Sequence, residues 1–147
     1  ELGNNAQLAR VLALQADARF GDQDLGFLGG RADGGAFTST ADLAAHVAQA
    51  LGRPALCIEG ATGPIRRIAW CTGGAQGYFE AAIAAGAQAF LTGEASEPQA
   101  HYARECGVSF LACGHHATER YGAPAVAAHV AAQLGLAHEF IDIPNPA

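Results

Sequence analysis

Short apolar runs alternate with longer segments of helical periodicity from residue 65 to the end of the chain. The runs are RIAWCTGG, QAFLTGE, VSFLACGH and EFIDIPN. Each is too short for a helix and carries branched or aromatic side chains, and all but the last run up to a glycine. We therefore predict four strands, separated by helices over residues 76–85, 98–106 and 123–134, in the order βαβαβαβ.

The predicted strands are apolar on both faces rather than alternating. Strands of this kind lie inside a mainly parallel sheet that is flanked by helices on both sides, and right-handed crossovers then bring all their carboxyl ends to one edge. Ligand crevices in open α/β sheets form at that edge. The polar side chains that follow the strands are Thr72, Thr92, Glu94, His115, His116, Glu119, Asp142 and Asn145.

The first sixty residues have a less regular pattern. A helix is expected near the start, with Asn4 or Asn5 as its N-cap, and a second one in TSTADLAAHVAQALG, where the spacing of Leu43, Val47 and Leu51 marks a buried face. Between them, residues 20–37 are rich in glycine and predict short strands and turns. The predicted fold class is α/β, with a glycine-rich irregular N-terminal segment.

Composition limits the cellular setting and the partners. The 147 residues fit a single α/β unit, residues 1–147, with a formal charge of −6, and only Arg66 and Arg67 are adjacent basic residues. This balance argues against nucleic acid as a main partner. No apolar run suits a membrane helix or a signal peptide, and the four cysteines have no Cys-x-x-Cys spacing, so we expect a cytoplasmic protein with reduced thiols. The chain does not begin with methionine, which predicts the C-terminal portion of a longer protein.

The segment GHHATERYG carries the strongest chemical signal. His115 and Glu119 are four residues apart, so in a helix they lie on one face and can share a cation such as zinc, iron or manganese. An ordinary exposed helix pair has the same spacing. Gly122 and Pro124 interrupt any helix that starts at His115, which predicts a short turn followed by a second helix.

Two neighbouring motifs leave alternatives open. Glu94 follows the adjacent predicted strand, where it can act as a general base or orient a metal-bound water, or simply place a charge at a helix start. The stretch TGGAQG, residues 72–77, has the glycines of an anion cradle and equally those of a tight turn, and it lacks the complete dinucleotide or P-loop patterns.

Over its whole length the chain resembles the dinuclear metal centre hexameric protein family, whose members are also called GTP cyclohydrolase I type II homologues. The resemblance lies in ELGNNAQLA, AWCTGGAQGYFEAAIAAGAQAF, FLTGEASEPQAHYARECGVSFLACG, GHHATERYG and FIDIPNPA. It implies an α/β protein with two divalent metal ions per site in a toroidal homohexamer. By the same resemblance His115 and Glu119 are metal ligands, and Glu94 is the acidic residue that lines their pocket.

The family's remaining ligands fall upstream of this sequence, so we expect the chain to hold half of a dinuclear metal site. One hypothesis is a metal-dependent hydrolase, GTP cyclohydrolase-like, acting on a small molecule that the sequence does not identify. The alternative is a non-catalytic metal-binding oligomeric scaffold or adaptor. A third hypothesis, a flavodoxin-like nucleotide binder, would use residues 72–77.

Overall fold

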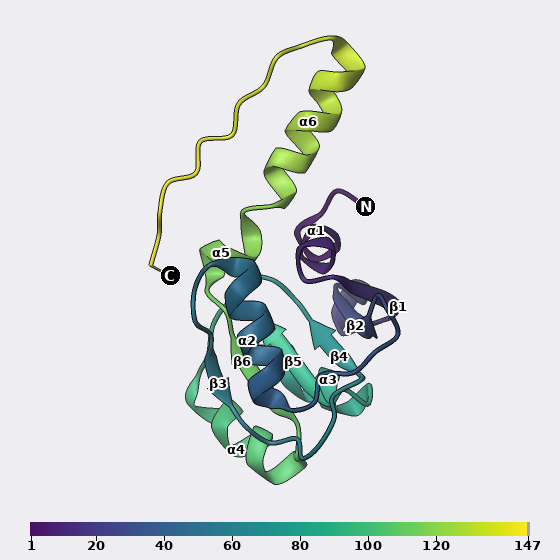
Figure 1. Cartoon of the computed structure of the whole chain (residues 1–147), viewed down its shortest axis with the longest axis vertical. Coiled ribbons are helices and arrows are strands. Elements are labelled where there is room, and N and C mark those ends of the chain that lie inside the picture. The colour runs from purple at the N-terminus through teal and green to yellow at the C-terminus, as the bar shows by residue number, and fades with distance from the viewer. Residues whose placement is uncertain (147) are drawn as a thin grey trace.

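The computed structural model describes residues 1–146 and shows a six-stranded sheet with helices on both faces (Figure 1). The strand order is β1-β2-β4-β5-β6-β3. The strands are β1 (Leu14–Phe20), β2 (Gly26–Arg31), β3 (Leu56–Ile58), β4 (Ile68–Trp70), β5 (Ala89–Thr92) and β6 (Ser109–Ala112). The helices are α1 (Asn4–Val11), α2 (Thr40–Leu51), α3 (Phe79–Ala84), α4 (Glu97–Cys106), α5 (His115–Glu119) and α6 (Gly122–Leu134), with short 3-10 turns η1 (Asp22–Asp24) and η2 (Gln76–Tyr78).

The centre of the sheet agrees with the prediction, whereas its edges do not. Strands β4, β5 and β6 are parallel neighbours joined by helical crossovers. The pairs β1·β2, β2·β4 and β3·β6 are antiparallel. The prediction of a mainly parallel sheet is therefore wrong for the described residues, because β2 and β3, which come from the first sixty residues, run antiparallel to the central strands beside them.

The glycine-rich N-terminal segment is also more regular than predicted. Gly26–Arg31 forms β2, which pairs with β1 as an antiparallel hairpin and with β4 on its other side. A side chain at Gly29 would overlap the Gln15 carbonyl of β1. Glycine is needed there because two strands approach closely at the irregular register of β1, so these glycines support a regular element.

Both faces of the central strands are buried, as their composition predicts. On one face Trp70 and Leu91 belong to an apolar cluster covered by α1 and α2. On the other, Phe79 of α3 stacks on Phe90 with ring centroids 5.8 Å apart and meets Phe110 edge-on at 5.0 Å. The helices thus fix the sheet from both sides and hold its carboxyl edge in place.

The first two helices test the capping predictions. Helix α2 begins after Ser39, whose hydroxyl accepts from the Asp42 N–H, and ends at Gly52 in the left-handed conformation. Its buried face is the predicted one. In α1, however, Gly3 is the N-cap and no side chain caps the helix, so the prediction for Asn4 or Asn5 is wrong.

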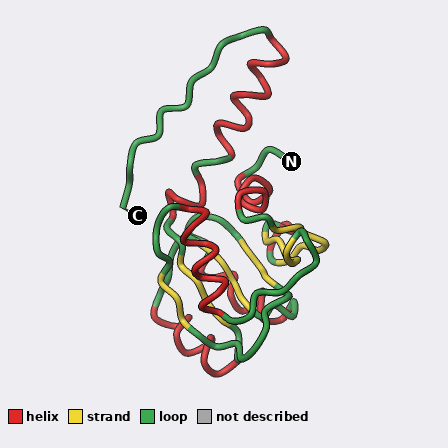
Figure 2. Tube along the Cα trace, in the orientation of Figure 1, coloured by secondary structure: helices red, strands yellow, loops and turns green. Residues whose placement is uncertain are grey.

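The chain leaves the body after α5. Helix α6 projects outward, and the segment that follows it returns as an extended loop towards α5 (Figures 1 and 2). The predicted strand EFIDIPN is therefore wrong within the described residues, and Ala147 of the motif FIDIPNPA lies outside them. In residues 1–146 no helix has both the length and the apolar character to cross a membrane.

Candidate metal centre

Three side chains meet where β5 and β6 end. Thr92 of β5 lies opposite Ala112 of β6 in parallel register, so the residues that follow each strand emerge side by side. Glu94 comes from the loop after β5, and His115 begins α5 directly after β6. The predicted convergence of Glu94, His115 and Glu119 is thus a consequence of strand register and one helical turn.

His115 lies between the two carboxylates. Its Nδ1 is 2.6 Å from Glu94 Oε1, and its Nε2 is 3.1 Å from Glu119 Oε2. The side chains of His115, Glu94 and Glu119 are 41%, 47% and 39% exposed, so a solvent-borne ligand can reach them. Both ring nitrogens therefore have an acidic partner at an open surface.

This arrangement changes the acid–base properties of the group. The hydrogen bond to Glu94 and the charge of Glu119 raise the pKa of His115, although burial opposes them. The same hydrogen bond lowers the pKa of Glu94. The carboxylates favour the protonated imidazole when no cation competes for the site, and a cation that binds at Nε2 must displace that proton.

The loop after β4 forms one wall of the site. Gly73 has φ +69°, and a side chain there would overlap the Glu119 carboxylate. The loop is fixed because the Gly73 N–H donates to Thr118 Oγ1 and the Thr92 hydroxyl donates to the Gly73 carbonyl. The Thr72 N–H also donates a hydrogen bond within the protein, to Asn5 Oδ1. The two amides at the start of residues 72–77 are therefore not open to an anion, which favours the tight-turn interpretation over the anion cradle.

Asn4 and Asn5, the two alternative candidates for the N-cap of α1, instead anchor the site. Asn5 Oδ1 accepts from the Thr72 N–H at 2.8 Å, and the Asn5 carbonyl accepts from Trp70 Nε1. Asn4 Oδ1 accepts from the Gly122 N–H, at the start of α6. These contacts connect α1 to both segments that flank the candidate metal centre. In the sequence, the two adjacent asparagine side chains of GNN were the feature that could have suggested this anchoring role.

A pocket of about 290 Å³ opens above the three side chains. The returning C-terminal segment contributes Asn145 to the lining, and Asp142 ties this segment to α5 through 3.1 Å contacts with both His116 Nε2 and Arg120 Nη1. The predicted clustering of Asp142 and Asn145 at this edge therefore holds without the predicted strand. The residues that line the pocket are Glu94, His115, His116, Glu119, Arg120 and Asn145.

The donors suit a metal ion in part. Nε2 of His115 and the nearby Glu119 oxygen are adjacent donors, and Glu94 has the position of a carboxylate that orients a ligating histidine through its other nitrogen. Yet among residues 1–146 no group of three or more histidine, cysteine or acidic side chains is arranged to hold a metal. Cys113 does not add a ligand: its thiol donates to the Leu111 carbonyl, and burial raises its pKa to about 12. The described residues therefore offer two metal ligands, and a complete metal site would need further ligands from elsewhere.

The sequence places the chain among known proteins. A family model described as Duf34/NIF3 (NGG1p interacting factor 3) matches residues 1–146. The chain belongs to the Duf34/NIF3 family. A Pseudomonas aeruginosa relative named GTP cyclohydrolase 1 type 2 homolog is 51% identical over the whole chain, and one from Allochromatium vinosum is 48% identical. The chain spans 58% and 57% of the length of these two relatives.

Solved structures confirm the fold of this Duf34/NIF3 chain. The protein ybgI, of unknown function, superposes with a TM-score of 0.92 at 40% identity, over all of this chain and 58% of its own. A Thermus thermophilus protein superposes with a TM-score of 0.79 at 29% identity, over all of this chain and 57% of its own. The family resemblance inferred from the motifs is therefore confirmed.

Proposed function

We propose that the chain supplies half of a dinuclear metal site in a metal-dependent hydrolase related to GTP cyclohydrolase 1 type 2 homologues. His115 and Glu119 are the proposed ligands for zinc, iron or manganese. The observation that carries the proposal is the placement of the His115 ring, with Nδ1 on Glu94 and Nε2 beside Glu119 at an open pocket. A histidine and a glutamate that merely pair on an exposed helix would not need the Glu94 carboxylate on the other ring nitrogen, Nδ1 of His115.

The chain's own groups have distinct tasks in this proposal. Glu94 accepts the Nδ1 proton of His115, which fixes the tautomer and leaves the Nε2 lone pair for a cation. When bound, divalent ions supply Lewis-acid activation of water or of a substrate oxygen. Glu94 is also the proposed catalytic base, because its side chain is 47% exposed at the pocket and a carboxylate is ionised at neutral pH.

A non-catalytic metal-binding scaffold is the second candidate, and a specific surface favours it. Helix α6 and the segment after it expose many large apolar side chains, and Glu139 and Asp142 are the charged residues among 122–146. Such surfaces mark protein interfaces. We propose assembly as a homo-oligomer, a hexamer by family resemblance, and a cytoplasmic setting, which suits four free cysteines. The exposed residues are Val126, Val130, Leu134, Leu136, Phe140, Ile141 and Ile143.

Metal content tests the site directly. The chain and a full-length relative are loaded with zinc, iron(II) or manganese(II), and the bound metal is measured by elemental analysis. We expect His115→Ala to lower the metal bound by the chain at least tenfold, because a ligand is lost. Its free energy of unfolding should change by less than about 1 kcal/mol, because the side chain is partly exposed. His101→Ala, an exposed histidine on α4, is the matched control.

Two results would contradict the proposal in different ways. An unchanged metal count in His115→Ala would remove the metal assignment altogether. A full-length relative that keeps its metal but turns over no nucleotide or ester, and whose assembly dissociates when metal is removed, would favour the scaffold over the hydrolase.

A further inference from the structure

A second, basic pocket lies at the opposite end of β4 from the candidate metal centre. Arg66 and Arg67 directly precede β4, whereas Thr72 follows it on the side of His115. Strands rise about 3.3 Å per residue, so the two ends are roughly 16 Å apart. The pocket encloses about 400 Å³. Its lining residues are Gln15, Asp17, Gly29, Gly30, Arg31, Gly34, Gly35, Arg66 and Arg67.

The pocket gathers positive charge in an acidic chain. All eight basic residues of the sequence are arginines, and three of them, Arg31, Arg66 and Arg67, line this one pocket. Asp17 is the acidic residue of the lining. A formal charge of −6 repels anions from the molecule as a whole, so local attraction at this face must come from these guanidinium groups.

The charges are only partly neutralised by the protein itself. Arg67 Nη1 lies 2.6 Å from both oxygens of Asp17, and Arg31 forms two hydrogen bonds to Asp33. The guanidinium of Arg66 forms no hydrogen bond or ion pair with any residue in 1–146. Asp17 and Asp33 are 63% and 59% exposed, and exposed ion pairs contribute little stability. A ligand can therefore displace either carboxylate at small cost.

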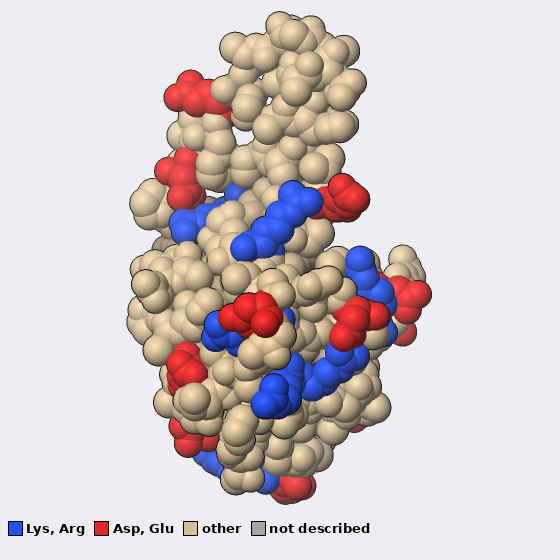
Figure 3. Space-filling view, turned by 45° about the vertical axis from the view of Figure 1, so that its right-hand side comes forward, with Lys and Arg blue, Asp and Glu red and all other residues tan. Residues whose placement is uncertain are grey.

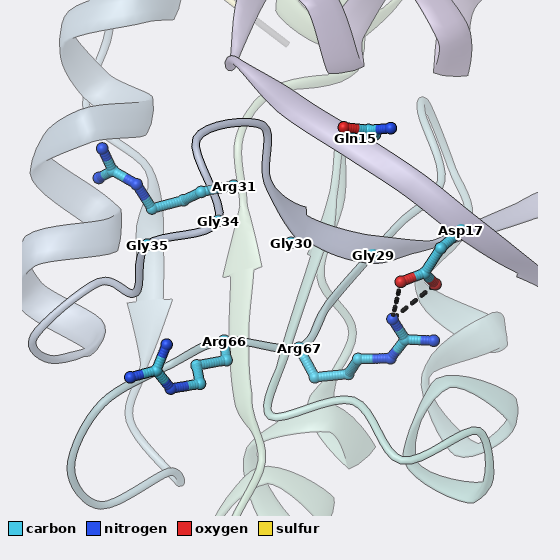
Figure 4. Close-up of a pocket in the computed structure, with 9 residues that line it drawn as sticks. All are labelled: Gln15, Asp17, Gly29, Gly30, Arg31, Gly34, Gly35, Arg66 and Arg67. Atoms are coloured by element: carbon cyan, nitrogen blue, oxygen red, sulfur yellow. Dashed lines mark hydrogen bonds and ion pairs between the residues drawn. The ribbon is translucent and has the colours of Figure 1, made fainter.

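The shape of the pocket specifies a polar ligand. Figure 4 shows the adjacent side chains of Arg66 and Arg67 extending in opposite directions, Arg66 towards the side of Arg31 and Arg67 towards Asp17. Gly29 and Gly30 give the floor no side chains, and no apolar side chain lines the pocket. A guanidinium group can donate two hydrogen bonds to the oxygens of one phosphate. Arginines at separate positions around the pocket therefore suit a ligand that carries two or more linked phosphates. The volume is that of a small-molecule site.

We propose that this pocket binds a small molecule that carries two or more linked phosphate groups. Arg66 contacts one phosphate, Arg67 contacts the next, and Arg31 adds a third positive charge to the lining. The site is separate from the metal centre and does not depend on the proposed hydrolase activity. Free polyphosphate and the phosphate chain of a nucleotide share this chemistry, and the experiment distinguishes them.

Calorimetric titration with tripolyphosphate, in buffer stripped of metal ions by a chelating resin, tests the site. We expect Arg66→Gln to weaken binding at least tenfold, because a charge-assisted contact is lost. Arg104→Gln, an exposed arginine on α4, makes the same change of charge elsewhere and should leave binding within about twofold. Asp17→Asn should tighten binding, because it removes a competing carboxylate. His115→Ala should leave it unchanged.

Amide NMR shifts localise the ligand, and titrations with ATP and citrate define its class. Shifts confined to Gly29, Gly30, Gly34 and Gly35 support the site, and tighter binding of ATP than of tripolyphosphate identifies the nucleotide as the source. Equal loss of affinity in Arg66→Gln and Arg104→Gln would overturn the proposal, as would citrate binding as tightly as tripolyphosphate. If Arg66→Gln instead changes self-association and not the titration, the arginines form a contact between copies and the ligand site is wrong.

Discussion

At the scale of single residues, the candidate metal centre depends on a glycine that carries no chemistry. Gly73 has φ +69°, and a side chain there would overlap the Glu119 carboxylate. We expect Gly73→Ala to destabilise the chain by about 1–2 kcal/mol, which is the cost of a left-handed conformation for an L-residue. It should also lower metal binding, because Glu119 must move. Urea unfolding and elemental analysis measure the two effects.

Gly74→Ala is the matched control for this prediction. A side chain at Gly74 would lie 3.6 Å from the Glu94 carboxylate, which is an ordinary contact, and its φ is not in the positive range. It should change stability and metal content little. Equal effects of the two substitutions would show that the loop tolerates neither, and that the left-handed conformation of Gly73 is not the cause.

The residues of the site differ in how far the sequence could predict them. His115 and Glu119 follow from a four-residue helical spacing, and Glu94 from its place after an apolar strand. The roles of Asn4 and Asn5 could not be derived in this way. Their partners are 65 or more residues away in the chain, at Thr72, Trp70 and Gly122, and only the folded contact of α1 with the sheet edge brings them together.

At the scale of elements, the start of α2 links stability to pH. The Thr38 N–H donates to Asp42 Oδ2 at 2.8 Å and lowers the pKa of Asp42. A lowered native pKa contributes stability that is present above the unfolded value near 3.9 and is lost as pH falls through the native value. Asp42→Asn should therefore destabilise the chain at pH 6 and have a smaller effect near pH 3.

Urea unfolding at the two pH values measures this difference. Asp22→Asn is a suitable control, because Asp22 is exposed in the turn between β1 and β2, away from α2. Should Asp42→Asn cost as much at pH 3 as at pH 6, the charge of Asp42 would not be the source of its effect, and the amide would act through packing or helix propensity.

The elements also show where apolar pattern suffices and where it fails. The central strands were predictable because both faces are buried, which leaves a continuous apolar run. Strand β3 was missed because it is a three-residue edge strand with a 57% exposed Leu56. The segment EFIDIPN has the pattern of a strand but pairs with no strand among the described residues, because it follows α6 away from the sheet (Figure 1). Pairing, which the pattern does not encode, decides such cases.

At the scale of the whole molecule, the projecting part has too much apolar surface for an isolated chain. Figure 3 shows this region almost without charged groups, in contrast to the body below it. Leu134, Leu136, Ile141 and Ile143 are 67%, 59%, 72% and 71% exposed. Burying such area contributes about 25 cal/mol per Å². Association through α6 and the segment after it is therefore the expected state.

Sedimentation velocity tests this expectation. We expect the chain to sediment as an oligomer at micromolar concentration, and Leu134→Glu combined with Ile141→Glu to shift it towards monomer, because two charges must then be desolvated at the contact. Leu25→Glu, at a 49% exposed leucine in the turn between β1 and β2, adds one such charge elsewhere and should leave the oligomer intact. A wild-type chain that remains monomeric at all concentrations would contradict this expectation and would leave the surface to a partner of different sequence.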